Sequence, residues 1–176
     1  LRTRRQRQMC IRDSKHTLRS ESVLKEDIQY DIGYDTHIGA HKALYMQTNQ
    51  DSFYIAQEGN HLLLCVLDGI STSDAGSGDM ASAIARNVIH QIWEQHKESL
   101  KESNEQDLAG LLYHMLREAN FHICKFAKEL AGGSLGDKTP MGTTAVVALI
   151  DGSDGIVATL GDSRAYLHTT EGTVIL

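Results

Sequence analysis

The sequence predicts an α+β fold in which antiparallel strands precede and follow a pair of helices. Residues 62–67 are six apolar residues in a row, the pattern of a strand buried on both faces. Apolar residues then recur at helical spacing over residues 80–92 and 107–130. Apolar and β-branched runs return at residues 143–150 and 156–160. This order of strands, two helices and further strands differs from the alternating strands and helices of a parallel α/β fold.

Short polar segments join the predicted elements before the helices. Residues 28–32 alternate apolar and polar side chains, as a half-buried strand does, whereas residues 38–45 are ambiguous. A strand over residues 52–56 is joined by a turn at 58–60 to the strand 62–67. We therefore expect these two strands to form an antiparallel hairpin.

The second half of the chain follows the same logic. A loop rich in Ser, Thr, Gly and Asp precedes the first helix, a polar connection separates the helices, and two glycines end the second helix. The strand 156–160 is interrupted by Gly161 and Asp162 and is expected to resume at 164–168, before a turn and a last strand that stops at Leu176. Because that strand has no partner after it, we expect the domain to be truncated at its C-terminus.

Length and composition indicate one domain that is neither membrane-spanning nor nucleic-acid-binding. The chain has 176 residues, a net charge of −6 and three cysteines without a C-x-x-C pair. It contains no apolar run near the roughly 20 residues that span a bilayer and no recognisable signal peptide. Cys65 and Cys124 lie in apolar patterns, which favours reduced core thiols and a cytoplasmic location.

Residues 1–22 differ from the rest of the chain. They have no apolar period and are rich in arginine. They resemble a translated sequencing adaptor at the end of an assembled fragment, so we exclude them from the predicted domain, residues 23–176. The alternative is a basic arm for an acidic partner.

Three acidic positions accompany the predicted strands. They are Asp51, at the start of one strand; Asp68, before Gly69 at the end of the next; and Asp162, after Gly161. Carboxylates brought together without a basic residue repel one another, and a divalent cation relieves that repulsion. Because these ligands are all oxygens, they favour magnesium or manganese. The alternative is that Asp68 and Gly69 form an ordinary turn at the end of a strand.

Five motifs resemble, in order and context, the metal-dependent protein phosphatases of the PPM type. They are residues 49–53, 66–69, 81–82, 141–145 and 161–167. The resemblance implies a β-sandwich flanked by helices with a centre of two or three Mn²⁺ or Mg²⁺ ions. It implies hydrolysis of phosphoserine and phosphothreonine by a metal-bridging water without a phosphoenzyme.

The same resemblance assigns roles to matching residues. Asp68 bridges the two metals, the carbonyl of Gly69 binds one of them, and Asp51 supports the cluster, so Asp51 and Asp68 are the candidate catalytic residues. Asn49 and Gln50 are supporting neighbours. Asp162 resembles a ligand of a weaker third metal, with a structural strand bulge as the alternative. The family's later metal-binding aspartates lie beyond Leu176.

Departures from the family pattern affect the phosphate and metal sites. Gln50 stands where many members have a glutamate, and an uncharged amide oxygen is a weaker metal ligand. Met46 stands where an arginine clamps the substrate phosphate, so Lys42 or His41 is the candidate replacement. Ser71, Thr72 and Ser73 replace the usual glycine pair and histidine, as in some bacterial members.

The leading functional prediction is therefore a bacterial serine/threonine phosphatase that acts on phosphoprotein substrates of a serine/threonine kinase. A second hypothesis is a regulatory PPM phosphatase of a partner-switching pathway. A third is a pseudophosphatase that serves as a binding module, motivated by Gln50 and Met46.

Overall fold

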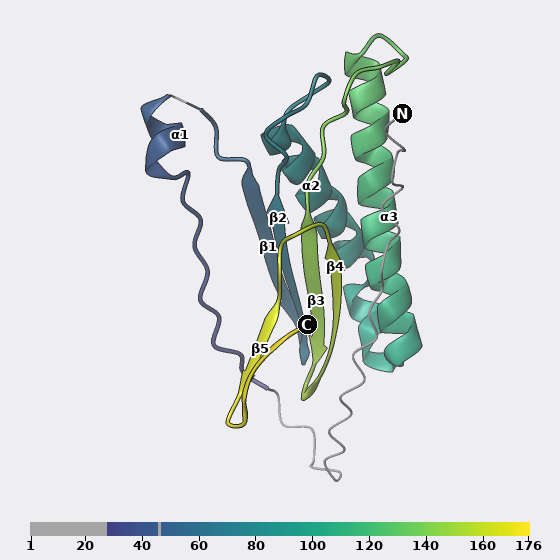
Figure 1. The fold of residues 1–176 in the computed structure, drawn as a ribbon. Coiled ribbons are helices and arrows are strands. Elements are labelled where there is room, and N and C mark those ends of the chain that lie inside the picture. Colours follow the sequence, from purple (N-terminus) through teal and green to yellow (C-terminus); the bar gives the residue numbers. More distant parts are fainter. Residues whose placement is uncertain (1–27, 46) are drawn as a thin grey trace, which may run out of the picture.

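A computed structural model describes residues 28–45 and 47–176, without the side chains of His41 and Glu102. Its main sheet is antiparallel and has the strand order β1-β2-β3-β4, and β5 and β6 form a separate hairpin. The elements are α1 (Ala40–Leu44), β1 (Asp51–Glu58), β2 (His61–Asp68), α2 (Gly78–His96), the 3-10 helix η1 (Lys97–Glu102), α3 (Glu105–Leu130), β3 (Ala145–Asp151), β4 (Asp154–Leu160), β5 (Tyr166–Thr169) and β6 (Gly172–Ile175). Helices α2 and α3 cover one side of the sheet, and the β5–β6 hairpin lies on the other (Figure 1). The predicted α+β fold is confirmed.

The strand β2 lies between β1 and β3 and is buried more strongly on the side of the helices than on the other side. Leu63, Cys65 and Leu67 are at most 1% exposed, whereas Val66 is 54% exposed. The prediction that this strand is buried on both faces is therefore wrong at Val66. The six-residue apolar run shows which side chains tolerate burial. Only one face of β2 is fully buried, because the helices cover only that face.

The two long helices close the core against β2 and β3. Their buried faces repeat apolar residues at helical spacing, and the largest fully buried side chains include Trp93, Ile89, Leu112 and Met115. Helix α3 begins two residues earlier than predicted because Asn104 caps it, its side chain accepting hydrogen bonds from the backbone N–H of Gln106 and Asp107. The connection predicted between the helices contains η1.

Two predicted strands differ from the structure. Residues 28–32 form no strand: Ile28 and Ile32 are exposed, and this segment contacts the sheet through side chains. The Tyr30 hydroxyl donates to the carbonyl oxygen of Asn60, and the Ile28 N–H donates to the Asn60 side chain. The strand predicted at 164–168 is present as β5, but β5 pairs with β6 and not with the main sheet, so it does not continue the strand 156–160. The prediction for residues 1–22 lies outside the described residues.

Cys65 is expected to resist alkylation in the folded protein. Burial raises the pKa of its thiol from 9.0 to about 12, so the reactive thiolate is scarce at neutral pH. Mass spectrometry after iodoacetamide treatment should find Cys65 labelled at least tenfold more slowly in native than in urea-unfolded protein. The Cys65 thiol ionises at a lower pH in the unfolded protein than in the folded protein. Its ionisation therefore lowers folding stability as the pH rises from 9 to 12. Equal labelling rates in the two states would contradict the packing of β2.

Candidate metal centre

Asp51 and Asp68 face each other across the hairpin of β1 and β2. Asp51 starts β1, Asp68 ends β2, and the two are partners in the antiparallel register. Burial raises the pKa of Asp68, and the charge of Asp51, a hydrogen bond with Asp51 and the charge of Asp162 raise it further. The nearby ammonium of Lys42 lowers it. The fold thus brings Asp51, Asp68, Asp162 and Lys42 within electrostatic reach of one another.

The backbone of Asp68 is held from β3 by Thr144. The Asp68 N–H donates to the Thr144 hydroxyl oxygen at 3.1 Å, and the Thr144 N–H donates to the Asp68 carbonyl at 2.8 Å. The same hydroxyl lies 2.7 Å from that of Ser163, the neighbour of Asp162. Thr144 therefore connects Asp68 to the segment that carries Asp162. The sequence did not show which residues Thr144 joins.

Gly69 lies against the start of helix α2, where there is no room for a side chain. A Cβ at Gly69 would collide with the backbone carbonyl of Gly78 and lie 2.7 Å from the Gln50 carbonyl oxygen. A Cβ at Gly78 would lie 2.6 Å from the carbonyl carbon of Gly69 and 2.8 Å from the carbonyl oxygen of Ile70. The two glycines let the backbone after Asp68 pack directly against α2. Sequence reasoning missed Gly78, because its partner lies nine residues away across a loop.

The start of α2 is also fixed to strand β1 by a pair of hydroxyls. Ser82 is fully buried, and its Oγ lies 3.0 Å from the Oγ of Ser52, the residue after Asp51. Ala81, also fully buried, leaves room for this close packing. The Ala-Ser motif at 81–82 thus positions the helix next to the paired aspartates.

Gln50 connects Lys42 and Ser71. Its side-chain oxygen Oε1 accepts a hydrogen bond from the Lys42 ammonium at 2.9 Å and another from the Ser71 hydroxyl at 2.6 Å. The Gln50 carbonyl accepts from the Gly69 N–H at 3.0 Å. Sequence reasoning identified Lys42 and Gln50 separately and missed Ser71 as their partner. The side chain of His41 and the whole of Met46 lie outside the described residues.

Asn49 supports the start of β1. Its Oδ1 accepts from the Asp51 N–H at 3.2 Å, and its Nδ2 donates to the Thr36 hydroxyl at 2.9 Å. Thr36 belongs to the segment 28–39, which runs alongside the sheet from the turn at Asn60 to α1 (Figure 1). Asn49 thus ties this segment to the hairpin that carries the aspartates.

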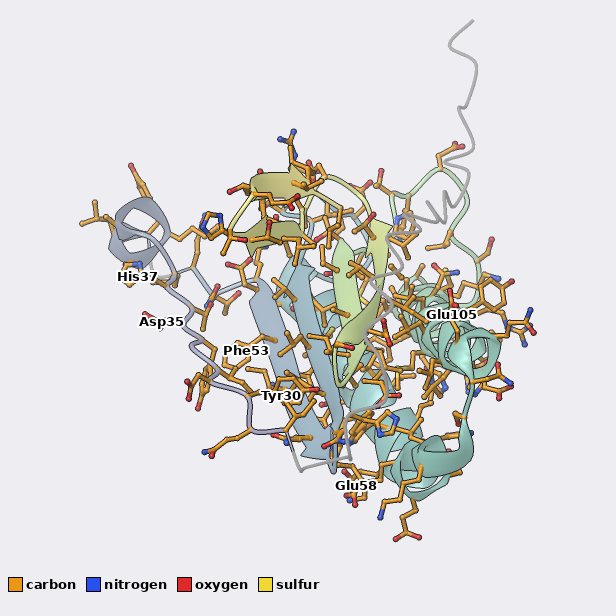
Figure 2. All side chains as sticks on the ribbon, turned by 90° about the horizontal axis from the view of Figure 1, so that it is seen from below. Tyr30, Asp35, His37, Phe53, Glu58 and Glu105 are labelled. Carbon is orange, nitrogen blue, oxygen red and sulfur yellow. The ribbon has the colours of Figure 1, made fainter. Side chains whose placement is uncertain are left out.

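A cleft of about 820 Å³ lies between this segment and the sheet, with both aspartates among its lining residues. Its apolar wall includes Phe53, whose ring centroid is 5.1 Å from that of Tyr34. Figure 2 shows Phe53 on the side of the sheet where the segment with Tyr30, Asp35 and His37 runs. Over the described residues, no group of three or more His, Cys, Asp or Glu side chains is placed to hold a metal ion.

The chain thus has an antiparallel sheet that is backed by two helices and carries a pair of aspartates at one end of a hairpin. The family model of protein phosphatase 2C matches residues 38–176, so the chain belongs to this family. This finding confirms the resemblance to PPM-type phosphatases.

Curated relatives match a large part of the chain. The serine/threonine phosphatase Stp of Listeria monocytogenes is 32% identical over 108 residues, which are 61% of this chain and 39% of the relative. The Stp of Listeria welshimeri gives the same identity and coverage. The chain therefore spans about two fifths of the length of these relatives.

Solved structures share the fold. The serine/threonine phosphatase PstP/Ppp of Mycobacterium tuberculosis is 25% identical with a TM-score of 0.52, covering 73% of this chain and 47% of that one. A PstP catalytic domain in complex with two manganese ions gives 25% identity and a TM-score of 0.53, covering 73% of this chain and 48% of that one. These likenesses confirm the predicted fold class. No helix among the described residues is long and apolar enough to cross a membrane.

Proposed function

We propose that the protein to which this chain belongs hydrolyses phosphoserine and phosphothreonine in proteins. The observation that carries the proposal is the pairing of Asp51 with Asp68 at one end of the hairpin, with the charge of Asp162 acting on the same carboxyl. Membership of the protein phosphatase 2C family and the names of the Stp and PstP relatives support it. We propose that this enzyme is bacterial and cytoplasmic and that it opposes a serine/threonine kinase.

The residues of this site have the ligand chemistry that divalent cations prefer, although no three of these side chains lie close enough together among the described residues to complete a metal site. Asp51, Asp68 and Asp162 offer carboxylate oxygens. Burial raises the pKa of Asp68, and the charges of Asp51 and Asp162 raise it further, which supports a need for positive charge at this site. A hard cation ligated by oxygen supplies that compensation, which favours Mn²⁺ or Mg²⁺. The PstP structure with two manganese ions supports a centre of two, and Asp162 is our candidate ligand for a third.

Each residue has a proposed role. Asp68 and the carbonyl of Gly69 would hold the ions, and Asp51 would bind them directly or through water. When bound, such ions polarise a phosphoryl oxygen and lower the pKa of a water molecule. Asp51 and Asp68 hold the charge that orients this water, and Lys42 binds a phosphate oxygen. The water oxygen forms a bond to phosphorus as the bond to the serine or threonine oxygen breaks, without a phosphoenzyme. The water loses a proton and the leaving oxygen gains one, so the products are inorganic phosphate and the free hydroxyl.

We further propose that residues 23–176 are the N-terminal part of a longer domain and that additional ligands come from beyond Leu176. The match to two fifths of the Stp relatives supports this proposal. The 54% exposure of Val66, in a central strand of the main sheet, also supports it, because a covering layer would bury such an apolar side chain.

The test is manganese-dependent hydrolysis of a phosphothreonine peptide by the protein extended to the length of its relatives. We expect Asp68→Asn to lower kcat/KM by at least a hundredfold, because the substitution removes a charge that the cations require. The control is Asp137→Asn, an exposed aspartate in the loop between α3 and β3. Equal rates for wild type and Asp68→Asn would contradict the proposal.

A pseudophosphatase is the second candidate, favoured by the engagement of Gln50 with Lys42 and Ser71 in place of a charged ligand. It predicts that the extended protein binds phosphopeptides but does not turn them over with manganese or magnesium. The same assay, combined with a binding measurement, separates the two candidates.

A further inference from the structure

We propose that Gln50 is a positioning residue that holds Lys42 in place to bind phosphate and is not itself a metal ligand. This inference deepens the proposed function and rests on it. We call Lys42, Gln50 and Ser71 together the Gln50 link. Its ligand is a phosphate dianion, as presented by a phosphoserine or phosphothreonine side chain.

The hydrogen bonds of Gln50 leave its amide oxygen little capacity for a metal. A carbonyl oxygen has two lone pairs, and Gln50 Oε1 accepts from both Lys42 Nζ at 2.9 Å and Ser71 Oγ at 2.6 Å. A cation at this oxygen would have to displace one of these donors. Gln50 therefore differs in role from Asp51, the next residue, whose carboxylate pairs with Asp68.

The neutral amide has a consequence for the charge of Lys42. An ammonium has three N–H donors, and Gln50 uses one without cancelling the positive charge. A glutamate at position 50 would form an ion pair with Lys42 and neutralise it. With glutamine, the hydrogen bond of 2.9 Å between Lys42 Nζ and Gln50 Oε1 leaves the positive charge of Lys42 in place. A phosphate dianion bound there would meet an ammonium with free donors.

Ser71 joins this arrangement to a loop that is held by hydrogen bonds to residues 139 and 142. Ile70 N–H donates to the Gly142 carbonyl at 2.8 Å, and Asp74 N–H donates to the Thr139 carbonyl at 2.8 Å. The Asp74 carboxylate accepts in turn from the Thr139 N–H at 2.9 Å. Because the loop is fixed on both sides of Ser71, its hydroxyl holds the Gln50 side chain in one orientation, and Gln50 holds Lys42.

The experiment is a double-mutant cycle on the extended, manganese-loaded protein, with the dissociation constant for inorganic phosphate measured by calorimetry. We expect Lys42→Met and Gln50→Leu each to weaken phosphate binding about tenfold. In the Lys42→Met background, Gln50→Leu should change it less than twofold, because Gln50 acts through Lys42. Gln50→Glu should also weaken phosphate binding. The conservative substitution Lys42→Arg should weaken phosphate binding less than Lys42→Met does.

Manganese binding without phosphate is the second readout. Gln50→Leu should change it less than twofold, and a tenfold loss would overturn the proposal by making Gln50 a metal ligand. Additive effects of Gln50→Leu and Lys42→Met on phosphate would overturn it as well. Gln91→Leu and Lys128→Met, at exposed helix positions, are the matched controls. A protein that binds phosphate as expected but shows no hydrolysis would support the Gln50 link and overturn the catalytic proposal.

Discussion

Replacing Gly78 with alanine is expected to destabilise the protein by about 3 kcal/mol. The added Cβ would lie 2.6 Å from the carbonyl carbon of Gly69 and 2.8 Å from the carbonyl oxygen of Ile70. These are backbone atoms, so no side chain can rotate away, and the start of α2 has to move from the end of β2. Urea unfolding followed by circular dichroism measures the change as a shift in midpoint.

Gly110→Ala is the matched control for this prediction. Gly110 lies in α3, and a Cβ there would have no atom within 4 Å, apart from the helix's own backbone and its chain neighbours. Alanine has the higher helix propensity, so this variant should be more stable than wild type by up to about 1 kcal/mol. Destabilisation of the two variants by equal amounts would show that Gly78 does not pack against Gly69 as described.

Gly78 also shows why part of the site could not be predicted from the sequence. The aspartates and Gly69 could be predicted because each stands at the edge of a local strand pattern. Antiparallel pairing of two neighbouring strands then placed Asp51 opposite Asp68. Gly78 and Thr144 have roles that depend on backbone atoms from another element, and no local pattern records such a contact. The available signal for Gly78 was its place: it is a glycine at the first position of a helix, directly after the loop that follows a candidate ligand.

The errors in the fold have a shared physical cause. Alternation over residues 28–32 and the apolar run over 62–67 show which side chains tolerate burial, but burial depends on what covers them. Helices α2 and α3 cover one side of the sheet, so Leu63 is fully buried and Val66 is not. For residues 28–32, the Tyr30 and Ile28 contacts with Asn60 replace a strand ladder.

The second large predicted loss of stability concerns Leu63, which is on the face of β2 that the helices cover. Leu63→Ala should lower the free energy of unfolding by about 2–5 kcal/mol, because the side chain is 0% exposed in the core cluster and its loss leaves a cavity. Val66→Ala, on the opposite face of the same strand, should change it by less than about 0.5 kcal/mol in the present chain. Equal losses from the two variants would contradict the difference in burial between Leu63 and Val66.

The cost of Val66→Ala should depend on chain length if the proposed longer domain covers this face. Val66 is 54% exposed here, so removing two methyl groups loses little burial. In the protein extended to the length of its relatives, a covered Val66 should make the same substitution destabilising by about 1–2 kcal/mol. Val147, which is 0% exposed on β3, gives the matched substitution, and its cost should be similar at both lengths. An unchanged, small cost for Val66→Ala in the extended protein would show that this face stays open to solvent.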